Sequence, residues 1–293
     1  MNFEHNLQKL EYEKILDKLS LFCHTFAGKN LALNLEPCFK KDKVQKLLNE
    51  TLEASNLSFR KGVLPVSEIS DISSSLKKLE SNLFLSSKEL LDIAHIFKVS
   101  RELKAYFYND ESFDLSAFNI LDNMFSNLYT NLDIEKSISA SILDENTIAD
   151  NASPKLFSIR KSKKKVEDDI KESLNHILHS SNYSKAIMEQ IVTIRNDRYV
   201  IPVKEEFRSN VKGFIHDVSA SGSTVFIEPM SVFETNNKIA NLKMEEAIEI
   251  EKILQKISAL CFPICEELKR NVELIGLLDF IFAKAKLSKS MDA

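Results

Sequence analysis

The chain has 293 residues, a formal net charge of −4 and 44% hydrophobic residues, with only five glycines, six prolines and no tryptophan. This apolar content suffices for a buried core and excludes a disordered tail, while the scarcity of turn residues argues against α/β and β-sandwich folds. The four cysteines are too few and too unevenly spaced for a secreted disulfide framework, and the first ten residues hold no apolar leader. We therefore expect a mainly α, cytoplasmic protein with no membrane contact.

Residues 1–140 are predicted to form a helical core domain. Apolar residues recur there at intervals of three and four, which is the period of amphipathic helices that pack on one another. Interruptions at Glu36-Pro37, at Lys61-Gly62 and in the serine run 73–75 divide the first part into five or six helices.

Residues 141–189 are predicted to hold a connecting segment and a long outbound helix. Ser153 suits the N-cap position and Pro154 the first helical position. A narrow apolar stripe then runs from Leu156 to Leu178. At about 1.5 Å per residue, this helix would be roughly 40 Å long, which is too long for a compact core to surround.

Residues 190–229 change from helical period to alternation and predict about four short antiparallel strands. The pair Asn196-Asp197 suits a tight hairpin turn, and a serine-glycine loop at 219–223 joins a second pair of strands. Pro202 lacks a backbone donor, so its strand is expected to lie at an edge or to carry a bulge.

Residues 230–293 return to helical period. No proline or glycine interrupts the stretch from Met230 to Phe262. We expect two long antiparallel lever helices, held together by their apolar stripes, that carry a small antiparallel β clamp at the tip. The second lever then returns to the core.

Positive charge gathers in the middle of the chain. Residues 154–215 hold 13 basic and 8 acidic residues. Basic side chains interleaved with aromatic ones on a small sheet are typical of a nucleic-acid contact surface, although the aromatics could equally form the core of the sheet. The candidates for phosphate contacts in this sheet are Arg195, Arg198, Lys204, Arg208 and Lys212.

A second basic group, residues 160–165, lies near the start of the outbound helix. It either forms a ridge that contacts phosphates, with Lys161 and Lys164 as candidates, or a solvated helix face. In the second alternative these lysines pair with the acidic run 167–169 at helical spacing.

No catalytic residue, cofactor site or metal site is predicted in the chain. His216 and Asp217 are strand neighbours that point to opposite faces, so they do not begin a catalytic triad. Cys261 and Cys265 are half of a metal site at most, and core cysteines are the simpler interpretation. No phosphate-binding glycine loop occurs, so this chain alone should not hydrolyse ATP.

The stretch RNDRYVIPVKEEFRSNVKGFIHDVSASGSTVFIEPMSVFETNNKIANL resembles the endonuclease type of MutS-like proteins, the second bacterial MutS family, and the match is specific from Arg195 to about Leu254. The resemblance extends upstream through ENTIADNASPKL and downstream through LDFIFAKAK. It implies a helical core, two levers and a clamp, and a chain that is a fragment of a longer protein.

In that family an ATPase domain follows, which uses ATP and Mg²⁺, and a nuclease domain ends the protein. The resemblance implies a dimeric parent that binds branched DNA to suppress recombination, or collided ribosomes to split them. Clamp closure would be coupled to ATP use. The alternative from the residues alone is a helical scaffold that mediates protein contacts or dimerisation without binding nucleic acid.

Mismatch-repair MutS proteins use the Phe of a Phe-x-Glu motif beside a mispair, and Phe226-Ile227-Glu228 has this pattern. It falls in the last predicted clamp strand, and the recognition domain of those proteins is missing from the sequence. We interpret this match as a coincidence.

Overall fold

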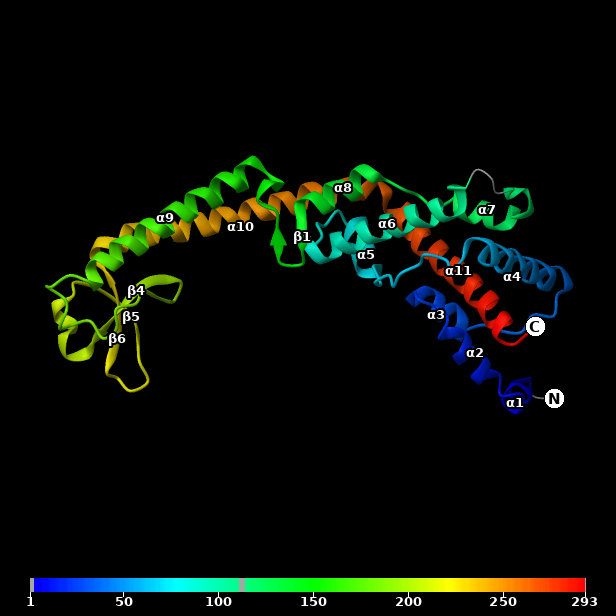
Figure 1. Cartoon of the computed structure of the whole chain (residues 1–293), viewed down its shortest axis with the longest axis horizontal. Coiled ribbons are helices and arrows are strands. Elements are labelled where there is room, and N and C mark those ends of the chain that lie inside the picture. Colours follow the sequence, from blue (N-terminus) through cyan, green and yellow to red (C-terminus); the bar gives the residue numbers. More distant parts are fainter. Residues whose placement is uncertain (1–2, 111–113, 293) are drawn as a thin grey trace. The chain divides into compact units, whose positions relative to one another are not determined.

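The computed structural model describes residues 3–110 and 114–292 and confirms a mainly α-helical protein with small antiparallel sheets. The chain divides into two compact units (Figure 1). Unit 1 comprises Met1–Ile148 and Leu254–Ala293, and unit 2 comprises Ala149–Ile253. Helix α10, Phe233–Cys261, has residues in both units.

Unit 1 consists of helices and one short hairpin. Its α-helices, besides the end of α10, are α1 (Phe3–Lys9), α2 (Tyr12–Ser20), α3 (Phe26–Leu33), α4 (Lys41–Lys61), α5 (Ser73–Glu80), α6 (Ser87–Tyr108), α7 (Asn119–Ser126), α8 (Leu132–Ser141) and α11 (Cys265–Ser290). Its hairpin pairs β1 (Ile142–Asp144) with β2 (Thr147–Ile148). The serine run 73–75, expected to be a break, instead begins α5.

The core of unit 1 forms around α6 and α11, which are the helices with the most buried residues in this unit. Ser86 and Glu89 form a capping box that satisfies backbone N–H groups at the start of α6. The buried Asn271 of α11 donates to the Ser100 hydroxyl of α6 over 2.9 Å and to the Tyr129 carbonyl over 2.7 Å. A satisfied polar network thus fixes how these two helices face each other.

Helices α3 and α11 pack with their backbones close together. A Cβ atom at Gly276 would lie 2.5 Å from the Cβ of Ala27, so only glycine fits there. On the next turn of α11, the buried Asp279 accepts hydrogen bonds from the Thr25 backbone N–H over 2.7 Å and from its hydroxyl over 2.8 Å. The start of α3 is therefore held on α11 by close packing at Gly276 and by hydrogen bonds to the Asp279 carboxylate.

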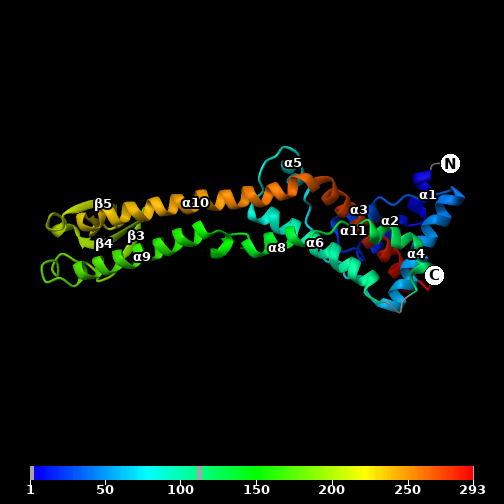
Figure 2. The ribbon, with the colours of Figure 1, turned by 90° about the horizontal axis from the view of Figure 1, so that it is seen from above.

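Unit 2 contains the two long helices that the sequence predicts. Helix α9 spans Pro154–Leu178, and the Ser153 hydroxyl caps it by accepting from the Leu156 N–H over 3.0 Å. The returning helix α10 begins at Phe233, after the single 3₁₀ turn Met230–Val232. The two helices run side by side in opposite directions (Figure 2).

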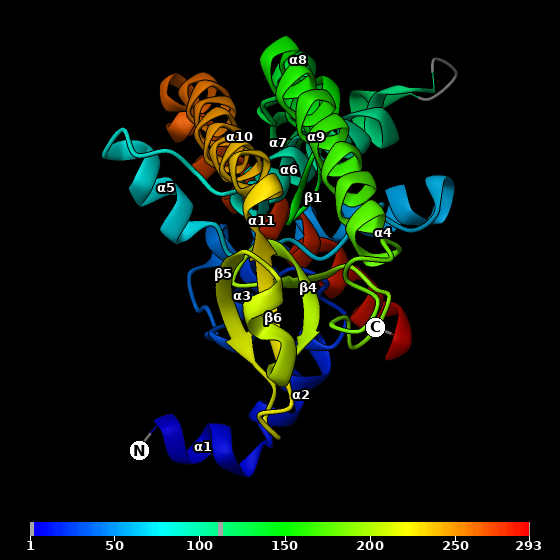
Figure 3. The ribbon, with the colours of Figure 1, turned by 90° about the vertical axis from the view of Figure 1, so that its left-hand side faces the viewer.

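A four-stranded antiparallel sheet joins the two long helices. The strands are β3 (Thr193–Arg195), β4 (Arg198–Lys204), β5 (Gly213–Val218) and β6 (Thr224–Pro229). Their order in the sheet is β3-β4-β6-β5, so β4 and β6 are the inner strands (Figure 3). Asn196 and Asp197 have φ values of 48° and 62°, as a tight β3–β4 hairpin turn requires. The predicted clamp strands are confirmed.

The expectation that Pro202 lies in an edge strand or at a bulge is wrong, because β4 is an inner strand and its pairing with β6 is regular through Pro202. Pro202 pairs with Phe226 of β6 on one side. On the other side the β3 ladder ends at Val200, and beyond it the Pro202 carbonyl accepts from the Met188 N–H over 3.0 Å. Proline is tolerated because the regular pairing with β3 has already stopped there.

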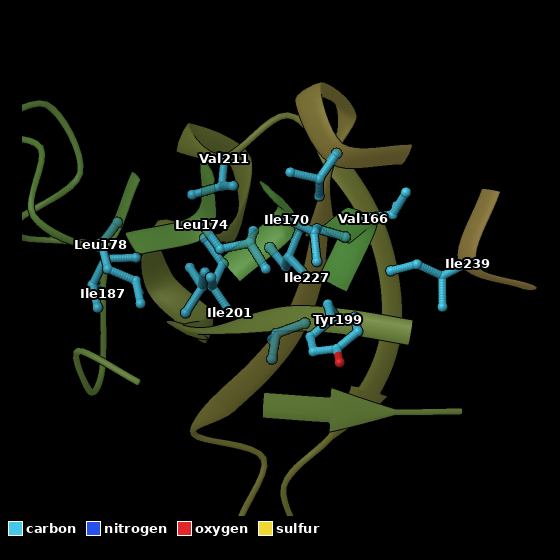
Figure 4. Close-up of a cluster of buried hydrophobic side chains, with 14 residues drawn as sticks. Val166, Ile170, Leu174, Leu178, Ile187, Tyr199, Ile201, Val211, Ile227 and Ile239 are labelled. Atoms are coloured by element: carbon cyan, nitrogen blue, oxygen red, sulfur yellow. The ribbon is translucent and has the colours of Figure 1, made fainter. Parts of the chain in front are cut away.

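One face of the sheet packs on α9 (Figure 4). The apolar cluster contains Ile170 and Leu174 of α9, Ile201 of β4 and Ile227 of β6, all of them at most 1% exposed. Ile239 of α10 joins the same cluster. The apolar stripe of α9 therefore packs on the sheet over its second half, and not only on the other long helix as the sequence suggested.

Candidate nucleic-acid interface

Arg195 of the edge strand β3 is paired with an acid of the opposite edge strand, β5. Its Nε lies 3.1 Å from the Asp217 carboxylate of β5, and its guanidinium stands 4.2 Å from the centre of the Phe226 ring. The adjacent Asn196 side chain donates to the His216 carbonyl over 2.8 Å. Since β3 and β5 are the two edge strands, these contacts show that the sheet curls until its edges meet at this corner.

Arg198 belongs to a buried polar network centred on Glu228. The Glu228 side chain is fully buried and lies 3.0 Å from Arg198 Nη1 and 2.6 Å from His216 Nε2. The Asn236 amide donates to the same carboxylate over 2.7 Å and to the Tyr199 carbonyl over 3.0 Å. Strands β4, β5 and β6 and helix α10 are joined through one carboxylate.

The other three sheet candidates face solvent to different degrees. Arg208 is exposed and pairs with Glu205 over 2.9 Å, three residues earlier. Lys212 is exposed and Lys204 half-buried, and neither ammonium group forms an ion pair with any residue that the structure describes. The structure therefore places three of the five cations on strands of the sheet and two, Arg208 and Lys212, in the connection between β4 and β5, and the three arginines are paired with acids of the chain.

The basic residues 160–165 on α9 also include both side chains that are paired with acids and side chains that are not. Arg160 and Lys163 both pair with Glu246 of α10, and Arg160 also pairs with Asp150. Burial alone would raise the pKa of Glu246, but hydrogen bonds from Lys163 and Arg160 hold it below its usual value of 4.5. These pairs connect α9 to α10 in the first half of α9, whereas the second half of α9 packs on the sheet.

Lys161 and Lys164 are exposed, and within residues 3–110 and 114–292 neither forms an ion pair. In particular, the acidic run 167–169 does not pair with them, so that detail of the solvated-face alternative is wrong. Their charges are free for an external anion or for water.

Unit 2 as a whole has no net charge, although its middle segment has an excess of basic residues. Residues 149–253 hold 16 basic and 16 acidic residues, because α10 brings acids that offset the excess of the preceding segment. Any phosphate contact must therefore use the lysines that these acids leave free.

The His-Asp-Ser group has no catalytic geometry. His216 points to Glu228 and not to Asp217, while the hydroxyls of Ser221 and Ser223 lie 2.8 Å apart in the β5–β6 loop. Among the described residues, no cluster of three His, Cys, Asp or Glu side chains is arranged to hold a metal ion. The four cysteines are free thiols.

The helices were compared with what a membrane span needs in length and apolar character. Across the described parts of the chain, none combines the length and apolar character that a bilayer crossing requires.

The sequence is similar to those of known proteins over nearly its whole length. The chain is 46% identical over 285 residues to the endonuclease MutS2 of Acetivibrio thermocellus, 42% identical over 279 residues to that of Ruminiclostridium cellulolyticum, and 37% identical over 288 residues to that of Clostridioides difficile. These matches cover 95–98% of the chain. Over this region, the chain belongs to the MutS2 family.

The chain spans only about a third of the length of these MutS2 relatives, since the matches cover 35–36% of each of them. No model of a known protein family matches it. The MutS2 relatives confirm the resemblance to the endonuclease type of MutS-like proteins that the sequence motifs indicate.

The Phe-x-Glu pattern of this MutS2-family chain has a structural role. Phe226 lies under the Arg195 guanidinium and Glu228 is buried in its network. The Glu228 carboxylate is fully buried and already paired, so it is not available to a nucleic-acid base, which agrees with a coincidental match to the mismatch-recognition motif.

Sequence reasoning missed the acids that hold the basic residues. Glu228, Asp217 and Glu246 appear in the sequence as ordinary polar positions of a strand or helix. Glu246 is 83 residues from Lys163, and no local spacing relates them. The only signal was the equal number of basic and acidic residues over 149–253, which indicates that many cations have acidic neighbours.

Proposed function

We propose that unit 2 grips the sugar-phosphate backbone of branched DNA or ribosomal RNA. The observation that carries this proposal is the set of lysines without acidic partners on one small module. Lys204 ends β4, Lys212 directly precedes β5, and Lys161 and Lys164 lie on α9. An exposed ammonium group that is not neutralised internally releases counterions when it meets a phosphate, and this release drives binding.

Arg195, Arg198 and Arg208 take a secondary role in this proposal. Each already has a carboxylate partner, so a phosphate has to share or displace it. Arg208 is the most accessible of them, because its side chain is 60% exposed. We therefore rank Arg208 next after the four lysines.

The two long helices suit a lever that moves the sheet. Ion pairs from Glu246 to α9 and the shared apolar cluster connect α9, α10 and the sheet, so the three elements move together. We infer that the parent protein closes this clamp with ATP and Mg²⁺ bound in a further domain, as a dimer with endonuclease activity. The relatives are named endonucleases, and this chain covers about a third of their length.

A salt titration tests the proposal. The chain is titrated against a four-way DNA junction and, separately, against a structured ribosomal RNA segment, at ionic strengths between about 50 and 200 mM. We expect affinity to fall steeply with salt. Lys204→Ala and Lys212→Ala should each weaken binding and reduce the logarithmic salt slope by about one.

Lys136→Ala, an exposed lysine of α8 in unit 1, is the matched control and should change neither quantity. The two ligands distinguish DNA from RNA as the source of the phosphates. Absence of binding to both, or affinity that is independent of salt, would contradict the proposal and favour a scaffold that binds only protein.

A further inference from the structure

A cavity of about 380 Å³ lies in unit 1 beside the last turns of α4 and α11. This volume is typical of sites that bind small molecules. Most of the lining is apolar, and three aromatic rings contribute to it, those of Phe22, Phe59 and Phe282. A few polar side chains complete the lining, as in most small-molecule sites: His24, Ser55, Ser58, Lys286 and Lys289.

Hydrogen bonds within the chain fix the walls of the cavity. Helix α4 ends where Gly62, with φ of +83°, turns the backbone, and the Gly62 carbonyl accepts from the Tyr106 hydroxyl over 2.9 Å. Asp279 accepts from the His24 backbone N–H over 2.9 Å and so holds another part of the lining. The cavity therefore exists before a ligand arrives, and binding does not have to supply the free energy to form it.

Two apolar side chains of the lining extend into solvent. Phe59 is 88% exposed and Val63 is 78% exposed. Phe282, by contrast, is 7% exposed and belongs to the interior. A ligand with an apolar body would cover Phe59 and Val63 and remove their surface from water, which favours binding.

The charged groups of the lining select an anion. Lys286 and Lys289 are exposed and lie three residues apart on α11, and within residues 3–110 and 114–292 neither forms an ion pair. Side chains at this spacing are neighbours on one face of a helix, so both ammonium groups can reach one carboxylate. The Lys286 ammonium group lies 5.0 Å from the centre of the Phe22 ring, which places it beside the apolar lining.

A cationic ligand would find no free acid in this cavity. Among the lining residues that the structure describes, Asp279 is the only acid. It is 2% exposed, and its carboxylate already accepts from the His24 N–H, the Thr25 N–H and the Thr25 hydroxyl. The charge that remains available to a ligand is therefore positive.

We propose that this cavity binds an amphipathic carboxylate, a small molecule whose apolar body fills the cavity and whose carboxylate lies between Lys286 and Lys289. A purely apolar occupant would take water from these two ammonium groups without giving them a partner, which is unfavourable. All the lining residues belong to unit 1, so the proposal is independent of the phosphate binding proposed for unit 2.

Isothermal titration calorimetry of the 293-residue chain tests the proposal with three probes that share one apolar chain: octanoate, octanol and octylammonium. We expect octanoate to bind about tenfold more tightly than octanol, and octylammonium to bind more weakly than octanol. Lys286→Gln and Lys289→Gln should each weaken octanoate binding about threefold and leave octanol binding unchanged. Lys269→Gln, at an exposed position of α11 outside the lining, is the matched control and should change neither.

Reversal of the charge gives a result that a folding defect cannot imitate. Lys286→Glu combined with Lys289→Glu should abolish octanoate binding and make octylammonium the tightest of the three probes. Ser55→Trp should fill the cavity and abolish the binding of all three. Asn56→Trp, at an exposed position of α4 that does not line the cavity, should leave binding intact.

Three outcomes would overturn the proposal. Absence of octanoate binding, or equal affinity for the three probes, would show that the lysines select no anion. Octanoate binding that the substitutions at positions 55, 286 and 289 leave unchanged would place the ligand elsewhere. Octanoate that binds this chain but not the parent protein, of which the chain represents about a third, would mean that a segment of the parent fills the cavity.

Discussion

The carboxylate of Glu228 and the side-chain amide of Asn236 meet over 2.7 Å in the interior of unit 2. Asn236 also exchanges two hydrogen bonds with the Tyr199 backbone, accepting from its N–H and donating to its carbonyl, each over 3.0 Å. The first turn of α10 is therefore bonded to both inner strands of the sheet. Movement of α10 along its axis has to carry the sheet with it.

Replacement of Glu228 should destabilise unit 2. In Glu228→Leu, Arg198 and His216 lose the acid that they share, and the Asn236 amide loses an acceptor. Loss of one partner of a buried pair costs about 3–5 kcal/mol, and we expect roughly 2–3 kcal/mol because Arg198 retains some access to water. Chemical denaturation together with hydrogen exchange of the β4 and β6 amides measures the change.

Glu206→Leu is the control for that experiment, since Glu206 is exposed in the 3₁₀ segment between β4 and β5. Its effect on unfolding should stay within about 0.5 kcal/mol. Equal stabilities for the two variants would show that the buried network contributes nothing to the fold.

The pairing of Glu246 with Arg160 and Lys163 should make unit 2 acid-sensitive. The pKa of Glu246 lies below its usual value of 4.5 in the folded protein. A lowered pKa contributes stability that is fully present above the unfolded value and is lost as pH falls through the folded one. The stability difference between the native chain and Glu246→Gln should therefore be largest at pH 7 and shrink below about pH 4.5.

Thermal unfolding at pH 7, 5 and 3.5 measures this difference. Glu245→Gln, at the exposed neighbouring position, should show a smaller difference at every pH. A Glu246→Gln difference that does not change with pH would mean that the ion pairs play no part in joining α9 to α10.

Substitution of Gly276 should separate α3 from α11. The new Cβ of Gly276→Ala would meet the Ala27 Cβ at 2.5 Å, so the helices must move apart, at a cost of about 1–3 kcal/mol. Hydrogen exchange of the α3 amides should become faster. Gly62→Ala strains a backbone with φ of +83° but has nothing within 4 Å, so α3 protection should remain unchanged there.

Thiol reactivity should follow burial. Burial raises the pKa of both Cys23 and Cys261 to about 12. At pH 8 only about one in ten thousand of these thiols would be ionised, so alkylation in the native protein should be very slow. Cys38 and Cys265 are both half-buried and should react before the two buried cysteines. Mass spectrometry after timed alkylation gives the order, and in denaturant all four should react alike.

The sequence predicts best what neighbouring residues decide. Ser153 with Pro154 marks the start of α9, and Asn196 with Asp197 marks the hairpin, because a cap and a tight turn need only adjacent residues. The position of Pro202 in an inner strand could not be predicted, since it depends on where the pairing of β3 ends.

Neighbouring residues in the sequence do not reveal whether a basic side chain is paired with an acid. Arg198 and Lys204 look equivalent in the sequence, as the basic residues at the two ends of one strand. Arg198 is paired with an acid 30 residues away, whereas Lys204 forms no ion pair within the described chain. Only the three-dimensional pairing of strands determines which charge is neutralised, so the sequence yields a set of candidates rather than a site.

The curl of the unit 2 sheet also bears on solubility. A short sheet with two free edges can recruit a strand from another molecule and so begin aggregation. Here Arg195 and Asn196 at one edge bond to Asp217 and to the His216 carbonyl at the other, which blocks both edges at that corner. At that corner the sheet therefore offers a second molecule less free edge to which a strand could be added.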